Sequence, residues 1–453
     1  MMKNNIARGF IYCSMAAVVS TAFTSCRFED EDLFDESPAL RIEHTGDKLK
    51  QILTEAPNGW VMQYFCGKDI SQFEGFNLFA KFDKNGKVTF AGNHRYLRDG
   101  NANKYTESVS TYNLQKEDGL VLEFSTWNDV LTPFSDPVSP WLAPTYVVKN
   151  GEGMHGDHNF CVLTINDNEV IMIGQRHQAT VRLVKCDRSW TQYIDDTEAM
   201  KQKIWSDDIH SLYVMDDEQT LYMDNAKTVN KHDGVFRFCD DLVYRNAVKA
   251  DSVAFVFTPN GLRFEKEQTV GHSKFQEMTL AEDNSALVSE DGNVKMMATW
   301  DLYLAQSEAI QWIDAESLSA DLKPLYDAID KALTANNKNY TLARIGIGRT
   351  TNPNNVLGLC VQWFTNTRKT SRSMGGLALT RSMPSKAQIA IVCDENANID
   401  NNMKARSAEV QAAVRALGAA LAKTYNVTPG SYFLPSAAKF VSVDGTTSFT
   451  YAD

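Results

Sequence analysis

Short apolar runs separated by turn residues dominate the chain between positions 60 and 190. Such runs lie at 60–65, 76–82, 87–91, 110–114, 120–125, 145–148, 160–166, 169–174 and 179–185. Asp83-Lys84-Asn85-Gly86 and Asn166-Asp167-Asn168 carry the residues that favour tight hairpin turns. Many short strands at this density predict an antiparallel sheet, sandwich or barrel.

Helical patterns precede and follow this run of strands. Ser37-Pro38 is typical of a helix start, and Leu49, Ile52 and Leu53 follow at helical spacing before Pro57-Asn58-Gly59 ends the helix. A second helix is predicted from about 190 to 204. A later hairpin, 253–257 and 262–265 around Thr258-Pro259-Asn260-Gly261, resembles the first in having Phe before an Asn-Gly turn. The shared hairpin raises the hypothesis of a duplicated helix-plus-sheet unit.

The pattern changes after about residue 305. One helix is predicted from apolar residues at i, i+3, i+4, i+7 and i+11, namely Leu322, Leu325, Tyr326, Ile329 and Leu333. A second is predicted from Val410, Val414, Leu417 and Leu421, with apolar runs at 356–364, 387–393, 439–443 and 448–451. The predicted fold class is therefore α+β, predominantly antiparallel β with a barrel-like unit, followed by a C-terminal mixed α/β region.

The length of 453 residues exceeds one ordinary core, so several domains are expected. The predicted division is a leader at 1–25, an acidic tether at 26–36, a helix plus antiparallel β domain at 37–190, a second helix plus β unit at 191–305, and the mixed region at 306–453.

The first 26 residues predict export and lipid attachment. Lys3 and Arg8 precede a short apolar stretch from Phe10 to Phe23, which is shorter than the roughly 20 residues that span a bilayer. Phe23-Thr24-Ser25-Cys26 resembles a bacterial lipobox, which predicts cleavage before Cys26 and lipidation of its thiol. Acyl chains on that cysteine would anchor the protein firmly, at about 0.8 kcal/mol for each buried methylene. An ordinary signal peptide with an incidental cysteine is the alternative.

Charge narrows the range of partners. Without the leader the chain has 43 basic and 57 acidic residues, a net charge of −14. Such a surface repels nucleic acid, so no nucleic-acid partner is expected. Six acids and one arginine lie between Arg27 and Glu36. This segment is either a solvated tether or a sorting signal, because it resembles the surface-export signals of Bacteroidetes lipoproteins.

The cysteines of the mature chain beyond Cys26 are Cys66, Cys161, Cys186, Cys239, Cys360 and Cys393. Six cysteines allow 15 disulfide pairings, and their spacing selects none of them. Most lie in apolar runs, which predicts that they act as small buried hydrophobic residues. No C-x-x-C motif occurs, so neither a zinc ribbon nor a thioredoxin-like site is predicted.

Four sequence matches to known sites fail on context. The G-x-G-x-x-G match at Gly151–Gly156 precedes a strand, whereas a dinucleotide site needs a helix there. His155, Asp157, His158 and Cys161 offer zinc ligands, but on a glycine-rich loop. Asp394–Asp400 lacks the glycine and glutamate of a calcium loop, and Gly271–Phe275 lacks the second glycine of a nucleophile elbow. No catalytic residue, metal site or cofactor is therefore predicted.

One weak binding feature remains. Trp127, Trp141 and Tyr146 border or lie within a proline-rich loop, 128–145. Rigid aromatic rings on a stiff loop lose little entropy on binding and could stack on a sugar or a peptide. The alternative is that these rings cover the end of the sheet.

Several motifs of the first half resemble a family of Bacteroidetes lipoproteins of unknown function that are commonly encoded beside starch-utilisation-type outer-membrane uptake proteins. The matching stretches are Ala56–Trp60, Phe82–Gly86, Ser110–Tyr112, Phe124–Asn128, Phe134–Pro137, Gly156–Phe160 and Ser189–Tyr193. The chain departs from the family at His158 and Asn159, where an aromatic residue and an acid are usual. The resemblance implies a surface accessory protein of nutrient uptake and brings no catalytic residue.

These observations leave three hypotheses open. The first is a non-catalytic lipoprotein exposed on the outer membrane, which binds a glycan, a peptide or an uptake complex. The second is a surface hydrolase whose site is assembled from distant residues. The third is a structural or adhesive module.

Overall fold

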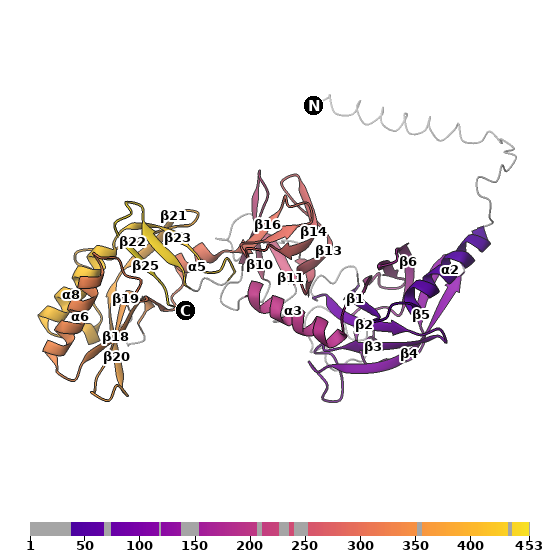
Figure 1. The fold of residues 1–453 in the computed structure, drawn as a ribbon, viewed down its shortest axis with the longest axis horizontal. Coiled ribbons are helices and arrows are strands. Elements are labelled where there is room, and N and C mark those ends of the chain that lie inside the picture. Colours follow the sequence, from indigo (N-terminus) through magenta and orange to yellow (C-terminus); the bar gives the residue numbers. More distant parts are fainter. Residues whose placement is uncertain are drawn as a thin grey trace, which may run out of the picture.

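The structure is a computed structural model that describes residues 38–67, 74–116, 119–136, 154–205, 211–225, 235–239, 252–350, 356–433 and 437–452. Three units follow one another along the long axis of the molecule (Figure 1). Two are eight-stranded closed barrels, and the third combines two antiparallel sheets with helices. The predicted leader, Cys26 and the acidic tether lie outside the described residues. Within the described chain, no helix is long and apolar enough to cross a bilayer.

The first barrel is an up-and-down meander. Helix α2 (Pro38–Thr54) precedes its strands β1 (Trp60–Phe65), β2 (Phe76–Phe82), β3 (Lys87–Gly92), β4 (Thr106–Lys116), β5 (Leu120–Phe124), β6 (Asn159–Ile165), β7 (Glu169–Gly174) and β8 (Thr180–Lys185). A short 3-10 helix η1 (Thr132–Phe134) lies between β5 and β6. Each strand pairs with the next, and β8 returns to β1 with Trp60 opposite Lys185.

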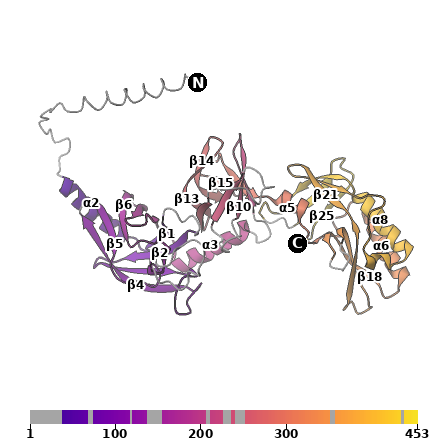
Figure 2. The same cartoon turned by 180° about the vertical axis from the view of Figure 1, so that it is seen from behind.

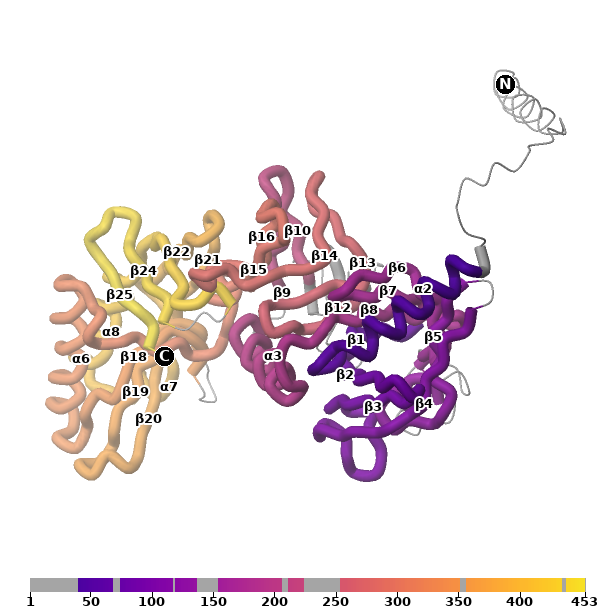
Figure 3. Tube along the Cα trace, turned by 45° about the vertical axis from the view of Figure 1, so that its right-hand side comes forward, coloured from indigo at the N-terminus to yellow at the C-terminus, as the bar shows by residue number. Residues whose placement is uncertain are grey.

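Successive side chains of β1 point alternately into and out of the barrel. Trp60, Met62 and Tyr64 of β1 point into the barrel core, whereas Val61 between them belongs to a separate outer cluster. Helix α2 lies across the barrel and contributes Leu49 and Leu53 to the same core (Figure 3). Side chains thus fill the interior, as expected for a barrel of eight strands.

The second barrel repeats this plan with different details. Helix α3 (Trp190–Ile204) leads into β9 (Ser211–Met215), β10 (Thr220–Asn225), β11 (Val235–Cys239), β12 (Ser252–Thr258), β13 (Gly261–Val270), β14 (Ser273–Leu280), β15 (Leu287–Ser289) and β16 (Lys295–Ala298). Strand β16 closes the barrel against β9. The two hairpins that suggested duplication are not equivalent, because β2–β3 are the second and third strands of one barrel and β12–β13 the fourth and fifth of the other. The repeated feature is the helix-plus-barrel architecture.

Helix α3 joins the two barrels. Trp190, Tyr193 and Ile194 pack on the outside of the first barrel, whereas Met200 and Ile204 at the other end of the helix enter the core of the second. The barrels also touch directly, since Gly75 N–H donates to the Phe255 carbonyl at 3.1 Å and Arg182 pairs with Glu277 at 3.0 Å. The view from behind shows the same contact of helix and barrels (Figure 2).

The C-terminal unit combines antiparallel sheets and helices. Its helices are α5 (Trp300–Gln306), α6 (Lys323–Asn336), α7 (Asn401–Lys404) and α8 (Ala408–Leu421). One sheet contains β17 (Gln311–Trp312), β18 (Thr341–Arg349), β19 (Leu357–Phe364) and β20 (Arg372–Ala378). The other contains β21 (Thr380–Ser385), β22 (Gln388–Val392), β23 (Thr424–Thr428), β24 (Lys439–Ser442) and β25 (Ser448–Thr450). One continuous core links this unit to the second barrel.

The α+β, predominantly antiparallel fold class predicted from the sequence is confirmed. The helix at 190–204 has the predicted limits, and Pro324 lies in the first turn of α6 as expected. The sequence pattern did not predict β9, β10, β11, β14, β15 and β16 of the second barrel, nor β17, β18, β20, β21 and β23 of the C-terminal unit. Free thiols are observed at Cys66, Cys186 and Cys360, all buried, and at the partly exposed Cys161 and Cys393.

Candidate ligand site at the barrel junction

The end of the first barrel opposite α2 is closed by its own loops. Phe134 is fully buried there, and its ring lies 4.6 Å from Phe76 and 4.7 Å from His94, centroid to centroid. Asn128 fixes the loop that precedes Phe134, because its Oδ1 accepts the backbone N–H groups of Val130 and Leu131, both at 2.9 Å. These contacts give the loops a defined conformation beside the second barrel.

A polar pocket of about 300 Å³ opens at this junction. We call it the junction pocket; it is lined by Glu74, Gly75, Phe76, Asn77, Asn93, His94, Arg95, Asn103 and Lys201. Strand and loop residues of the first barrel form most of it, and α3 contributes Lys201. Three amides, two cations and one carboxylate in one hollow can exchange hydrogen bonds with a hydroxylated or peptide-like ligand.

Ion pairing and backbone contacts hold these side chains in place. Arg95 pairs with Glu74 at 2.6 Å, and the Asn77 amide donates to the carbonyl of Phe257 in the second barrel at 2.7 Å. The Oδ1 atom of Asn77 is buried without a hydrogen-bond partner. Buried acceptors are normally satisfied, so a donor group of a ligand or a water molecule would complete this one.

His94 at the floor of the pocket is a packing residue. Burial lowers the pKa of its imidazole to about 4, and a hydrogen bond of 2.9 Å joins its Nε2 to the Val130 carbonyl. A neutral ring committed to a backbone carbonyl holds the loop and does not serve as a general base at neutral pH.

Trp127 lies on the loop that follows β5, and half of its surface is exposed (52%). The guanidinium of Arg98 lies 4.7 Å from its ring centroid, and its indole N–H donates to Asp129 at 2.9 Å. Arg98 also pairs with Asp136 and comes from the same loop, 93–105, that supplies Asn93 and Asn103 to the junction pocket. Trp141 and Tyr146, the other predicted ligand-binding aromatics, lie outside the described residues.

The four zinc-ligand candidates of the sequence have structural roles. They are His155, Asp157 and His158 on the loop before β6, and Cys161 on β6 itself. The buried Asp157 carboxylate accepts backbone N–H groups of Arg176, His177 and Ala179, each at 3.1 Å. The ring of His155 stacks on His177 at 4.9 Å, centroid to centroid. Within the described chain these four residues do not bring three ligand atoms together. The strand predicted after the glycine-rich match is β6.

His158 makes the closest contact between a hydroxyl and a base in this loop. Its Nε2 lies 2.5 Å from Ser135 Oγ, and burial lowers the pKa of the ring. Ser135 Oγ also donates to the Thr132 carbonyl at 3.1 Å, which ends the short helix η1. The neighbouring Asp157 is committed to the 176–179 backbone, so it does not orient His158 as a third catalytic member would.

A cluster of acids and a histidine in the second barrel was not anticipated. Asp216, Asp217 and His272 lie on two adjacent hairpin turns, with ligand atoms within 4.8 Å of one another. His272 Nδ1 lies 2.8 Å from Glu218, whose carboxylate raises the pKa of the imidazole. Asp216 accepts the backbone N–H groups of Glu218 and Gln219 at 2.9 and 2.7 Å. The group is mostly exposed, and its contacts close the two turns.

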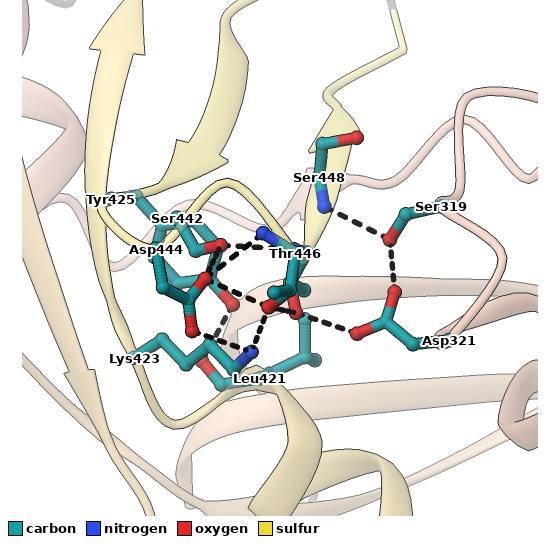
Figure 4. Close-up of polar contacts among 10 residues, drawn as sticks. Ser319, Asp321, Leu421, Lys423, Tyr425, Ser442, Asp444, Thr446 and Ser448 are labelled. Carbon is teal, nitrogen blue, oxygen red and sulfur yellow. Dashed lines mark hydrogen bonds and ion pairs between the residues drawn. The ribbon is translucent and has the colours of Figure 1, made fainter.

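A second polar network closes the last hairpin of the chain (Figure 4). Asp444 accepts from Ser442 Oγ at 2.5 Å and from Thr446 Oγ1 at 2.7 Å, while Lys423 approaches its other oxygen at 3.3 Å. Asp321 accepts from Thr447 Oγ1 at 2.6 Å and thereby holds the 314–322 segment to the hairpin. These hydroxyl groups are used within the turn or between the turn and the 314–322 segment, which indicates a structural role.

The remaining sequence matches also have structural roles. Asp394 Oδ1 accepts the backbone N–H of Asn396 at 2.7 Å, and Asp400 caps α7 through the Met403 N–H at 2.8 Å. His272 and Ser273 lie at the turn between β13 and β14.

The stretches that carried the family resemblance also make structural contacts. Tyr112 donates its hydroxyl to the Asp83 carbonyl at 2.6 Å, and Trp190 donates its indole N–H to the Asn58 carbonyl at 2.7 Å.

The family motif of Gly59 depends on close packing. Its φ is +68°, and a Cβ there would lie 2.6 Å from the Ala80 carbonyl oxygen and 3.1 Å from the ring of Trp190. Beside it, a shallow hollow of about 350 Å³ is lined by Pro57, Asn58, Lys81, Thr89, Glu107, Ser189 and Trp190. Lys81 and Trp190 both donate to backbone carbonyls of this turn, so the motif fixes the start of β1 against α3.

Comparison with known proteins identifies a family whose function is unknown. The model of a domain of unknown function, DUF4302, matches residues 30–282. No curated relative matches the chain. A DNA polymerase III beta subunit from Eubacterium rectale is 9% identical, with 92% of this chain and 97% of that chain covered, at a TM-score of 0.13. The corresponding subunit from Pseudomonas aeruginosa is 8% identical, with 91% and 97% covered, at 0.12. Such low scores carry no argument about fold or function.

Proposed function

Since the chain belongs to the DUF4302 family, whose function is unknown, we propose that it is a lipid-anchored surface protein that binds a ligand without transforming it. In this proposal, acyl chains on Cys26 hold it on the outer membrane. It assists the capture of a glycan or a peptide for an uptake complex. The lipobox motif at Phe23–Cys26 and the acidic segment after it support the location.

The junction pocket is the observation that carries the binding proposal. It combines several amides with Arg95, Lys201 and Glu74, and both barrels contribute to the contacts that hold them. Hydrogen-bond donors and acceptors fixed in a hollow suit recognition of a ligand rich in hydroxyl or amide groups. The Arg95–Glu74 ion pair and the Asn77 hydrogen bond to Phe257 hold these groups in fixed positions. Fixed groups lose little entropy when a ligand binds, which favours a binding function.

A matched pair of lysines on α3 tests the pocket. Lys201 lines it, whereas Lys203, two residues along the same helix, is exposed. Glycan and peptide libraries would be applied to the full-length mature protein in detergent. We expect a retained ligand whose affinity falls in Lys201→Ala and is unchanged in Lys203→Ala. The absence from both libraries of any ligand whose binding depends on Lys201 would contradict the proposal.

The anchor is tested separately. Labelled palmitate should enter the wild-type chain and not Cys26→Ser, and the variant should leave the membrane fraction. Protease added to intact cells should then remove the wild-type protein if the anchor faces outward. Labelling that persists in Cys26→Ser would refute the proposed attachment.

One observation favours a second candidate, a surface hydrolase. Ser135 and His158 lie within hydrogen-bond distance at 2.5 Å, as a nucleophile and its base do. If they act so, a library component should be cleaved by the wild-type protein and left intact by Ser135→Ala. Unchanged cleavage in that variant, or cleavage by neither protein, would remove the candidate.

A further inference from the structure

One face of the β17–β20 sheet carries a group of cationic and aromatic side chains. Strand register places Arg344 opposite Gln362, and Gln362 opposite Met374. Phe364 and Arg372 are paired two residues further along, and Trp312 of β17 lies on the same side through its pairing with Gly346. We call this set, with Lys369 of the β19–β20 turn, the cationic sheet face.

This face lies outside the core of the C-terminal unit. The opposite side of the same strands packs under the helices through Ile345, Val361 and Trp363, which are fully buried. Trp312, Phe364 and Met374 belong to no core cluster in the described chain. Arg372 and Lys369 are exposed, and Arg344 is half-buried. The face therefore presents its side chains to the solvent.

Aromatic rings hold the cations of this face in fixed positions. The guanidinium of Arg344 lies 3.7 Å from the ring centroid of Trp312, and its Nε donates to Gln362 Oε1 at 2.9 Å. Arg372 and Lys369 lie 5.0 and 5.7 Å from the ring of Phe364. A stacked guanidinium bonded through Nε keeps both terminal nitrogens available as a planar fork.

Arg381, Arg406 and Arg415 bond to backbone carbonyl groups, and five other arginines pair with carboxylates. The pairs are Arg95–Glu74, Arg98–Asp136, Arg182–Glu169, Arg188–Asp196 and Arg349–Glu308. Within the described residues, neither Arg344, Arg372 nor Lys369 pairs with a carboxylate. Burial and the nearby charge of Arg372 lower the pKa of Arg344, so like charges gather here without compensation. In a chain of net charge −12, this concentration calls for an external anion.

We propose that the cationic sheet face binds a glycan whose sugars carry carboxylates, with Arg344 and Arg372 each forming a bidentate contact to one of them. The inference rests on the proposed binding function and adds a second binding site, separate from the junction pocket. The backbones at these two arginines lie about 12 Å apart, because they are two strands and two residues removed. A polymer with repeated carboxylates can reach both, which a single sugar acid cannot.

The shape of the face favours a glycan over an acidic peptide. Extended peptides are recognised by adding to a sheet edge or by entering an apolar groove. Here Arg344 and Gln362 lie in the middle of the sheet, where the backbone groups are already paired between strands. Arg372 lies on the edge strand β20, but a peptide added along that edge would not reach Arg344 two strands away. Contact with both arginines therefore has to run across the strands, through their side-chain forks.

The test measures binding of oligogalacturonates of two and eight residues to the full-length mature protein in detergent. The octamer should bind, and more tightly than the dimer, because two forks act together. Its carboxyl-reduced, neutral counterpart should not bind. Arg344→Ala and Arg372→Ala should each weaken binding about tenfold or more. Arg344→Lys should also weaken it, because an ammonium group cannot form the fork.

Matched controls separate this inference from folding and from the junction pocket. Arg349→Ala removes an arginine of the same strand that already pairs with Glu308, so it should leave octamer binding unchanged. Lys201→Ala should also leave it unchanged. Failure of the octamer to bind while a junction-pocket ligand is retained would overturn only this inference. Equal binding of the neutral octamer, or tighter binding of a poly-glutamate peptide of matched charge, would overturn it as well.

Discussion

The two barrels share one architecture but hold their hairpin ends in different ways. In the first, buried polar groups such as Asp157, Asn128 and His94 fix the loops opposite α2. In the second, the half-buried Asp216 and the exposed His272 close two neighbouring turns. A buried hydrogen bond left unmade costs far more than an exposed one. The first barrel therefore depends on individual loop residues, and its loops are the more precise platform for a binding site.

The largest expected effect comes from the ring that closes the first barrel. Phe134→Ala removes a fully buried side chain that contacts Tyr64, Phe76 and His94. We expect the free energy of unfolding to fall by about 3–5 kcal/mol. Urea unfolding followed by tryptophan fluorescence measures this change. A loss below about 1 kcal/mol would show that the loop does not plug the barrel.

The two histidines should respond to pH in opposite directions. Burial lowers the pKa of His94 from 6.5 to about 4, so only the unfolded state takes up a proton in that range. The first barrel should therefore lose up to about 3 kcal/mol of stability as the pH falls from 6.5 to 4. His94→Gln should flatten this dependence in urea titrations at each pH.

His272 provides the contrast. Glu218 raises its folded pKa, so its contribution is complete below about pH 6.5 and is lost as the pH rises through the folded pKa. The group is exposed, and the effect should be small. His272→Gln should reduce stability slightly at pH 5 and leave it unchanged at pH 9. A larger effect at pH 9 would contradict this account.

A pair of aspartates compares the turns directly. Asp157→Asn replaces an oxygen that accepts backbone N–H groups by an amide, which leaves buried donors unpaired. We expect a loss of about 1.5–3 kcal/mol. Asp216→Asn alters an exposed turn and should cost less. Hydrogen exchange should increase at 176–179 in the first variant, and equal losses in both would remove the distinction between the barrels.

The sequence predicted the first barrel better than the second for a physical reason. Its strands are bounded by strong turn signals such as Asp83–Gly86, and its inward positions carry large apolar residues such as Trp60 and Phe90. Strands β9 and β10 are short and meet at Asp216–Gln219, which lacks glycine, so no pattern separated them. Barrel closure between β1 and β8 spans more than 100 residues and leaves no local trace.

The candidate sites were harder to predict than the fold. The junction pocket assembles Glu74, Arg95 and Lys201 from segments that only tertiary contact brings together. The cationic sheet face depends on register between β18, β19 and β20, which an isolated arginine does not reveal. Conversely, Asp157 and His158 were candidate zinc ligands in the sequence. In the structure, the Asp157 carboxylate accepts backbone N–H groups of residues 176–179, because a buried carboxylate needs hydrogen-bond donors.

The most direct test of binding without turnover is the mass of the ligand after incubation. A glycan or peptide retained by the full-length protein would be released after prolonged contact and analysed by mass spectrometry. We expect it to be recovered intact, in the amount that was bound. Shortened or chemically altered products that increase with time, and that require the folded protein, would contradict it.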